Sequence, residues 1–186
     1  MFAGWEGEAV DLQAGLNVGA ASMLNYEAAI ACDAGLIRRP LCIVAWSMGG
    51  LAAMMAARRV NPDALVLLEP SPPAEVRGFD ETAAVEGGTF DPEEIYGAFP
   101  LGVASRPESL LARSERTRGI SVPALECPTL VVYGDEFADQ RGKRVATFYG
   151  AEEAHIGGAS HWDLVLGDEA RQAVAAWARS ASASRM

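Results

Sequence analysis

The sequence predicts an α/β protein with a mostly parallel sheet flanked by helices. Three runs are continuously apolar and rich in Val, Leu or Ile, as strands covered on both faces are: residues 41–46, 64–69 and 129–134. Helical patterns lie between these runs, and strands that alternate with helices are typical of a parallel sheet. At 186 residues, half of them hydrophobic, the chain is long enough for one domain and short for two. We therefore expect a single domain over residues 1–186.

The remaining elements have weaker signals. Short alternating or apolar pieces predict two further strands, at residues 7–12 and 152–158. Patterns of helical period predict four helices, over residues 22–36, 49–60, 141–150 and 167–180. Together with the three strong runs they predict a sheet of about five strands.

Residues 71–128 break the alternation of strand and helix. They hold seven of the ten prolines and two short helix candidates, residues 91–99 and 106–119. The first candidate opens with Asp91 as N-cap and Pro92 at the first helical position. We expect this segment to leave the sheet and form a small lid over the carboxyl ends of the strands.

Composition excludes several classes of partner and cofactor. A net charge of −10 argues against nucleic acid and anionic membranes, because both bind a basic face. Cys32, Cys42 and Cys127 are odd in number and widely spaced, which fits free thiols and neither a disulfide framework nor a metal site. No run reaches the ~20 apolar residues of a membrane-spanning helix, and the first ten residues lack a signal-peptide pattern. We expect a cytoplasmic protein without metal or organic cofactor.

Ser47 is the candidate nucleophile. The segment Ala45-Trp46-Ser47-Met48-Gly49 approximates G-x-S-x-G, a turn from strand to helix that exposes a serine hydroxyl. Alanine replaces the first glycine and is nearly as small. An apolar strand precedes the motif and an alanine-rich helix follows it, as the motif requires. The alternative is a serine that caps an ordinary turn between strand and helix.

The chain holds two histidines that could act as the base. His161 lies in a loop after the last predicted strand, where a base can approach the serine. His155 lies within that strand, so we expect a packed or half-exposed sheet residue there. His161 is therefore the predicted base.

These motifs together resemble the α/β-hydrolase superfamily over residues 5 to 180. Residues 7–15 are similar to its strand and loop ahead of the nucleophile, residues 127–136 to its penultimate strand, and residues 158–162 to its histidine loop. Ser47 and His161 follow the family's order of serine, acid and histidine. The resemblance implies a serine hydrolase that acts on an ester or similar acyl compound.

Two positions in the chain could supply the acid that orients His161. The resemblance puts the usual aspartate at Phe137, so Asp135 and Glu136 are close substitutes. The other place used in the family is the end of the strand after the nucleophile helix, where this chain has Glu69. A glutamate that closes an apolar run needs a partner when buried, so we place Glu69 ahead of the other two.

The oxyanion site is incomplete in this sequence. The N–H of Met48 supplies one donor, whereas the resemblance implies a second donor from an H-G loop that does not precede residues 7–12. We expect a chain that starts at the family's fourth strand, with activity impaired by the lost loop. If so, residues 7–12 and 41–46 pair directly, or the chain is a fragment.

The leading prediction is a serine hydrolase with Ser47, Glu69 and His161 as catalytic triad and Met48 as oxyanion donor. The rival prediction is a truncated, weak or inactive hydrolase fold that binds a small molecule or a protein. The expected partner is a small acyl compound, and the oligomeric state is open. Lid residues that could line an acyl pocket are Phe79, Phe90, Ile95, Tyr96, Phe99 and Leu101.

Overall fold

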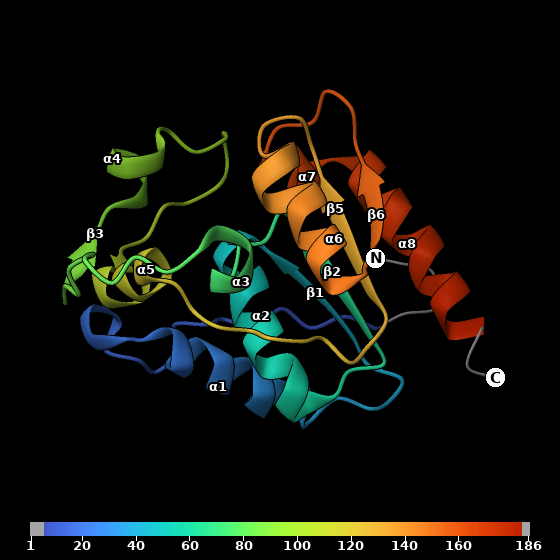
Figure 1. Cartoon of the computed structure of the whole chain (residues 1–186), viewed down its shortest axis with the longest axis horizontal. Coiled ribbons are helices and arrows are strands. Elements are labelled where there is room, and N and C mark those ends of the chain that lie inside the picture. The colour runs from blue at the N-terminus through green and yellow to red at the C-terminus, as the bar shows by residue number, and fades with distance from the viewer. Residues whose placement is uncertain (1–5, 184–186) are drawn as a thin grey trace.

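The centre of the protein is a four-stranded parallel sheet in the order β1-β2-β5-β6 (Figure 1). The computed structural model describes residues 6–183, so the first five and last three residues of the expected domain lie outside it. The strands are β1 (Cys42–Trp46), β2 (Ala64–Leu68), β5 (Thr129–Tyr133) and β6 (Glu152–His155). Trp46 pairs with Leu68, and Leu68 with Val132. The carboxyl ends of β1, β2 and β5 therefore meet at one edge, which is where ligands bind in such sheets.

Helices cover both faces of β2 and β5, as their apolar runs predicted. The same prediction is wrong for the edge strand β1, which is only partly buried and leaves Val44 45% exposed. Alternate residues of β2 and β5 face opposite ways: Leu65, Leu67, Val131 and Tyr133 pack with α1, α2 and α6. Val66, Leu68, Leu130 and Val132 pack instead with α8. Every residue of β2 and β5 is buried. The result is a three-layer α/β arrangement with two apolar cores.

The helices follow the predicted order with shifted ends. Their bounds are η1 (Val18–Ala20), α1 (Met23–Ala34), α2 (Ser47–Val60), α3 (Ala74–Arg77), α4 (Pro92–Tyr96), α5 (Leu110–Arg118), η2 (Ala138–Lys143), α6 (Arg144–Tyr149), α7 (Asp163–Leu166) and α8 (Asp168–Ala183). Ser22 and Asn25 form a capping box at the start of α1. The helix predicted over residues 141–150 is divided, because its first part adopts the wider π-helical turn η2.

Residues 71–128 leave the sheet between β2 and β5, and we call them the excursion segment. They form α3, α4, α5 and a two-stranded antiparallel sheet of β3 (Thr89–Phe90) and β4 (Glu108–Ser109). Asp91 caps α4 and Pro92 is its first residue, as predicted. The Ser109 hydroxyl donates to the carbonyl of Ala21 at 2.6 Å, which ties the segment to the start of α1. In Figure 1 the part of the segment with β3, α4 and α5 lies to one side of the main sheet, and α5 is near α1.

The strand predicted at residues 7–12 is wrong. Residues 6–11 are irregular and a turn follows them, so β1 has a free outer edge among the described residues. The carboxylate of Asp11 accepts the backbone N–H of Gln13 at 3.0 Å and pairs with Arg106 at 2.5 Å. Such an Asx turn diverts the backbone from an extended path. The direct pairing of residues 7–12 with residues 41–46 is therefore also wrong.

Two further sequence predictions concern cysteines and membranes. Cys32, Cys42 and Cys127 form no disulfide among the described residues. Cys32 is exposed, whereas Cys42 and Cys127 are partly buried. Within residues 6–183 no helix combines the length and the apolar character needed to cross a bilayer.

Candidate active site

Ser47 occupies a strained turn between β1 and α2. Its φ of 52° lies in the left-handed region, which non-glycine residues seldom adopt. The turn is tight because α2 packs on the chain after β2: a Cβ on Gly50 would lie 2.7 Å from Cβ of Pro70. Only glycine fits at that position. The local geometry thus has the strained serine and the close approach that the sequence motif predicted.

Glu69 is the residue that follows β2, and its side chain is completely buried. Its φ of 39° is also left-handed. One carboxylate oxygen, Oε1, accepts the backbone N–H of Gly134 at 2.8 Å, and the other, Oε2, lies 2.6 Å from Nδ1 of His161. Because burying a carboxylate without partners is costly, these two contacts account for its position.

His161 is held between two aromatic rings. Its ring lies 4.6 Å from the ring of Trp46 and 5.4 Å from the edge-on ring of Phe137, measured between centroids. Trp46 also donates its indole N–H to the carbonyl of His161 at 3.1 Å. Since Trp46 immediately precedes Ser47, these contacts place the imidazole beside the serine turn. The imidazole side chain itself is 14% exposed.

The other two candidate acids, Asp135 and Glu136, make different contacts. Asp135 lies 2.7 Å from Nε2 of His155 and accepts the N–H of Gly158 at 2.8 Å. These bonds hold the pKa of the Asp135 carboxyl below its usual value. Glu136 accepts the backbone N–H of His161 at 3.0 Å, so it contacts the main chain of the histidine loop and not the imidazole. His155 is the exposed last residue of β6, at the edge of the sheet.

The loop that carries His161 is anchored to the end of β5. The N–H of Asp135 donates to the carbonyl of Ala159 at 3.0 Å. A Cβ on Gly134 would lie 2.1 Å from that same oxygen, so only glycine allows the approach. The backbone of Gly134 therefore contacts both Glu69 and the loop that carries His161.

Ser47 is joined to its neighbours through the backbone. The N–H of Ser71 donates to the carbonyl of Ser47 at 2.8 Å. Within the described part of the chain the hydroxyl of Ser47 makes no hydrogen bond, to His161 or to any other group. Hydrogen bonds between catalytic groups are often long before a substrate binds. Met48 lies in the first turn of α2, where backbone N–H groups have no acceptor within the helix.

Sequence reasoning missed three residues that support His161. Trp46 and Phe137 contact its ring, and Gly134 binds its partner Glu69. The glycine after β5 was visible as the end of an apolar run. The two ring contacts depend on side-chain directions that spacing alone does not give.

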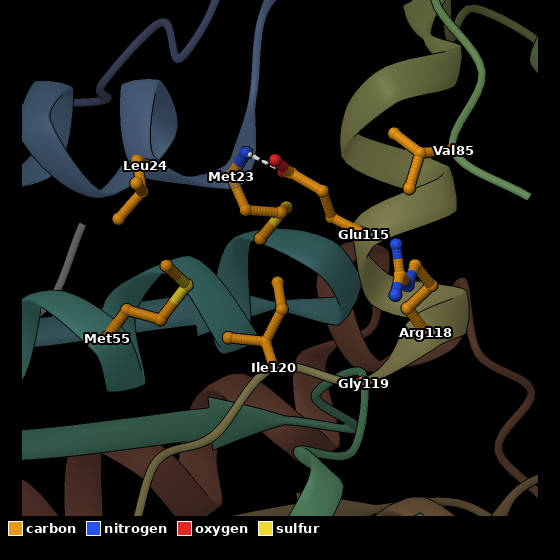
Figure 2. Close-up of a pocket in the computed structure, with 8 residues that line it drawn as sticks. All are labelled: Met23, Leu24, Met55, Val85, Glu115, Arg118, Gly119 and Ile120. Carbon is orange, nitrogen blue, oxygen red and sulfur yellow. Dashed lines mark hydrogen bonds between the residues drawn. The ribbon is translucent and has the colours of Figure 1, made fainter. Parts of the chain in front are cut away.

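A cavity lies elsewhere, between α1, α2 and α5 (Figure 2). It has a volume of about 400 Å³. Met55 on its wall is eight residues after Ser47, or about 12 Å along the helix. Figure 2 shows Glu115 reaching across to the N–H of Met23, a 2.7 Å bond that ties α5 to α1. None of the candidate catalytic residues lines this cavity, so we do not assign it to the reaction.

The excursion segment places most of the predicted pocket residues at its surface. Leu101 is fully exposed, and Phe79, Ile95 and Tyr96 are each about half exposed or more. Phe99 is different, because its ring lies 4.8 Å from that of Trp162, which in turn contacts Trp46. Within the described residues no cluster of three or more His, Cys, Asp and Glu side chains could hold a metal ion.

Comparison with known proteins gives a similarity of structure and none of sequence. No family model and no curated protein matches this sequence. Three solved structures match at a TM-score of 0.55. They are an alpha/beta hydrolase from a sediment metagenome of the Mar Chica lagoon, Morocco (14% identity), a monoacylglycerol lipase of Paleococcus ferrophilus (16%) and a malate-bound thermophilic esterase of Thermogutta terrifontis (20%).

The extent of the match is similar for these three structures. They cover 87% to 92% of this chain, and the chain covers 73% to 76% of each of them. The chain spans 58% of a further hydrolase, from Pectobacterium atrosepticum, at a TM-score of 0.46 and 17% identity. At these identities the matches establish the fold that is shared.

Proposed function

We propose that this chain, which has the α/β-hydrolase fold, is a serine hydrolase that cleaves an ester or similar acyl compound. The observation that carries the proposal is the bond between the buried carboxylate of Glu69 and Nδ1 of His161. This pair lies at the carboxyl ends of the strands, beside the strained turn of Ser47. A carboxylate, an imidazole and a serine in this order are the groups that activate a hydroxyl.

The proposed reaction begins with a proton transfer. The bond to Glu69 favours the tautomer that carries its proton on Nδ1, which leaves Nε2 of His161 free to accept the Ser47 proton. Ser47 Oγ then bonds to the acyl carbon, and the ester alkoxide leaves with the proton that His161 returns. Water attacks the acyl-serine in the same way, with His161 again as base. Glu69 stabilises the imidazolium that forms in each half.

The oxyanion would be held by the free N–H of Met48, at the start of α2. Losing one oxyanion donor lowers turnover by roughly a hundred- to thousandfold. We therefore predict slow turnover if Met48 is the only donor. We further propose that the excursion segment acts as a lid beside Trp162, which Phe99 contacts.

The acyl substrate class is supported by the structural neighbours. One is named as a monoacylglycerol lipase and another as an esterase. Because identity to both is low, their substrates do not transfer to this chain residue by residue. The proposed class is therefore a carboxylic ester of a small acyl group.

A second candidate function is a binding domain without catalysis. It is favoured by the absence of a hydrogen bond on the Ser47 hydroxyl among the described residues. In that case Glu69 and His161 would be a buried structural pair. Turnover distinguishes the two candidates.

The test is hydrolysis of 4-nitrophenyl butyrate by the purified chain and by Ser47→Ala. We expect release of 4-nitrophenol by the wild type and release at the background rate from the variant. Ser105→Ala is the matched control, since Ser105 is a half-buried serine of the excursion segment bonded to Asp91. Equal rates for wild type and Ser47→Ala would overturn the proposal and favour the binding domain.

A further inference from the structure

Two arginines near Ser47 and His161 have no acidic partner. Arg39, Arg59, Arg106, Arg144 and Arg171 each form an ion pair in the structure. Arg116 on α5 and Arg141 on η2 form none with any described residue, although both are partly buried. In a chain with 25 acidic residues and net charge −10, two partly buried cations without a carboxylate are unexpected.

Arg116 lies next to the serine turn. Its Nη1 donates to the hydroxyl of Ser71 at 3.4 Å, and the N–H of Ser71 donates to the carbonyl of Ser47 at 2.8 Å. Its Nε is buried and has no acceptor within the described residues. A buried donor without an acceptor is costly, so the guanidinium is held in this position while its bonding capacity is unfilled.

Arg141 lies near the imidazole, to which it is linked through Phe137. Its guanidinium carbon lies 4.2 Å from the centre of the Phe137 ring, a cation–π contact. The Phe137 ring in turn contacts the ring of His161. Each guanidinium group is therefore linked to the proposed site through one residue, Arg116 through Ser71 and Arg141 through Phe137.

The surrounding carboxylates offset the charge of the two cations only in part. Burial lowers the pKa of Arg141, and the charge of Arg116 lowers it further while Glu69 raises it. The two oxygens of Glu69 already bind Gly134 and His161, and Glu136 accepts the main chain of His161. Glu108, which Arg116 also influences, has a pKa raised by burial. An anion bound between the arginines would remove their repulsion.

We propose that Arg116 and Arg141 bind a carboxylate of the substrate, so that the preferred ester is a half-ester whose acyl chain ends in a free carboxylate. Guanidinium groups match a planar carboxylate through paired hydrogen bonds. A singly charged group suits this place because Glu69 and Glu136 already offset part of the positive charge. The inference rests on the proposed function for its catalytic readout and has a separate binding readout.

The first experiment compares butyl hydrogen glutarate with butyl pentanoate, which differ only in a terminal carboxylate or methyl group. We expect kcat/KM of the wild type to favour the charged ester by about tenfold or more. Arg116→Gln and Arg141→Gln should each lower that preference severalfold, mainly through KM, with the neutral ester little changed. Equal fall for both esters would show that the arginines only position Phe137 and His161, which would overturn the proposal.

The matched controls are Arg118→Gln, on the same helix as Arg116, and Arg144→Gln, which follows η2 and pairs with Asp139. Both should keep the preference of the wild type. Folding is checked by the urea midpoint of each variant, and Arg116→Lys and Arg141→Lys retain the charge if a glutamine variant fails to fold.

The second experiment measures binding without turnover, by calorimetry on Ser47→Ala. We expect monomethyl glutarate to bind at least about tenfold more tightly than dimethyl glutarate, and each arginine variant to lose that difference. Tighter binding of inorganic phosphate than of monomethyl glutarate would overturn the carboxylate assignment. Hydrolysis of both butyl esters at equal rates through Ser47 would sink this inference and leave the proposed function standing. Arginine-dependent binding without hydrolysis of either ester would overturn the proposed function and leave this inference standing.

Discussion

At the scale of single residues, backbone strain is concentrated at the proposed site. Ser47, Asn61 and Glu69 are the described non-glycine residues with positive φ. Asn61 ends α2, where a left-handed residue is common. Ser47 and Glu69 instead end two neighbouring strands. Strain of this kind costs on the order of 1–3 kcal/mol per residue and is retained where a function depends on it.

Three carboxylates were open as partners of His161 from the sequence, because Glu69, Asp135 and Glu136 all follow neighbouring strands. Chain spacing shows which residues reach the same edge, but the direction of each side chain depends on tertiary packing. In the structure Glu69 contacts the imidazole, Asp135 contacts His155, and Glu136 contacts the main chain.

Glu69→Gln tests the role proposed for this carboxylate. The amide can still accept the N–H of Gly134, but it cannot stabilise an imidazolium. We expect kcat for 4-nitrophenyl butyrate to fall on the order of a thousandfold or more. The matched control Asp135→Asn should keep activity near that of the wild type. Full turnover in Glu69→Gln together with its loss in Asp135→Asn would assign the acid to Asp135.

At the scale of elements, local pattern and local chemistry predicted the strands that pack between helices. β1, β2 and β5 lie within the predicted ranges. β2 and β5 are buried on both faces as their apolar runs predicted, whereas β1 at the edge of the sheet is partly exposed. The strand predicted at residues 7–12 does not form, because a strand needs a paired neighbour. Asp11 instead turns the chain through its bonds to Gln13 and Arg106. The turn at Ser47 was predictable, because the spacing of the glycines indicates how closely α2 approaches the next strand.

Gly50→Ala tests the packing of the turn between β1 and α2. The added Cβ would lie 2.7 Å from Cβ of Pro70 and 3.0 Å from its Cα, so α2 must shift. We expect the free energy of unfolding to fall by about 1–3 kcal/mol, as overpacking does, measured from urea unfolding curves.

Gly49→Ala is the matched control for this substitution. Its Cβ would meet only Cδ1 of Leu12, at 3.8 Å. Alanine is the better helix former, so this variant should be as stable as the wild type or more stable by up to about 1 kcal/mol. Equal stability of the two variants would contradict the close approach of α2 to Pro70.

At the scale of the whole molecule, the class of fold followed from composition and periodicity, whereas the surroundings of the site did not. Four of the six residues expected to line a pocket are exposed, and the rings of Trp46 and Phe137 contact His161 instead. Residues far apart in the chain make these contacts, so no local pattern could predict them. Nor could a local pattern predict that Arg116 and Arg141 lie near the proposed site.

Stability at alkaline pH is a property of the whole molecule that the buried thiols and phenols determine. Burial raises the pKa of Cys42 to about 11, and it raises the pKa of Tyr26, Tyr133 and Tyr149 as well. The unfolded thiol ionises near pH 9. The folded state then holds a proton that the unfolded state has lost, so stability is full below about pH 9 and falls up to about pH 11.

We therefore expect the free energy of unfolding to decrease as pH rises from 9 to 11. Cys42→Ala should show a shallower decrease, by about 2 kcal/mol over this interval, and Cys32→Ala at the exposed thiol should follow the wild type. Urea unfolding at a series of pH values measures both. Identical slopes in Cys42→Ala and wild type would mean that the thiol does not titrate in this way.

The most direct test of the central claim is covalent labelling by a fluorophosphonate, followed by peptide mass spectrometry. It reports on an activated serine whatever the natural substrate is. We predict a single adduct on Ser47, formed slowly in His161→Ala and absent in Ser47→Ala. Folded wild-type protein that stays unlabelled, or that is labelled equally in Ser47→Ala, would contradict it.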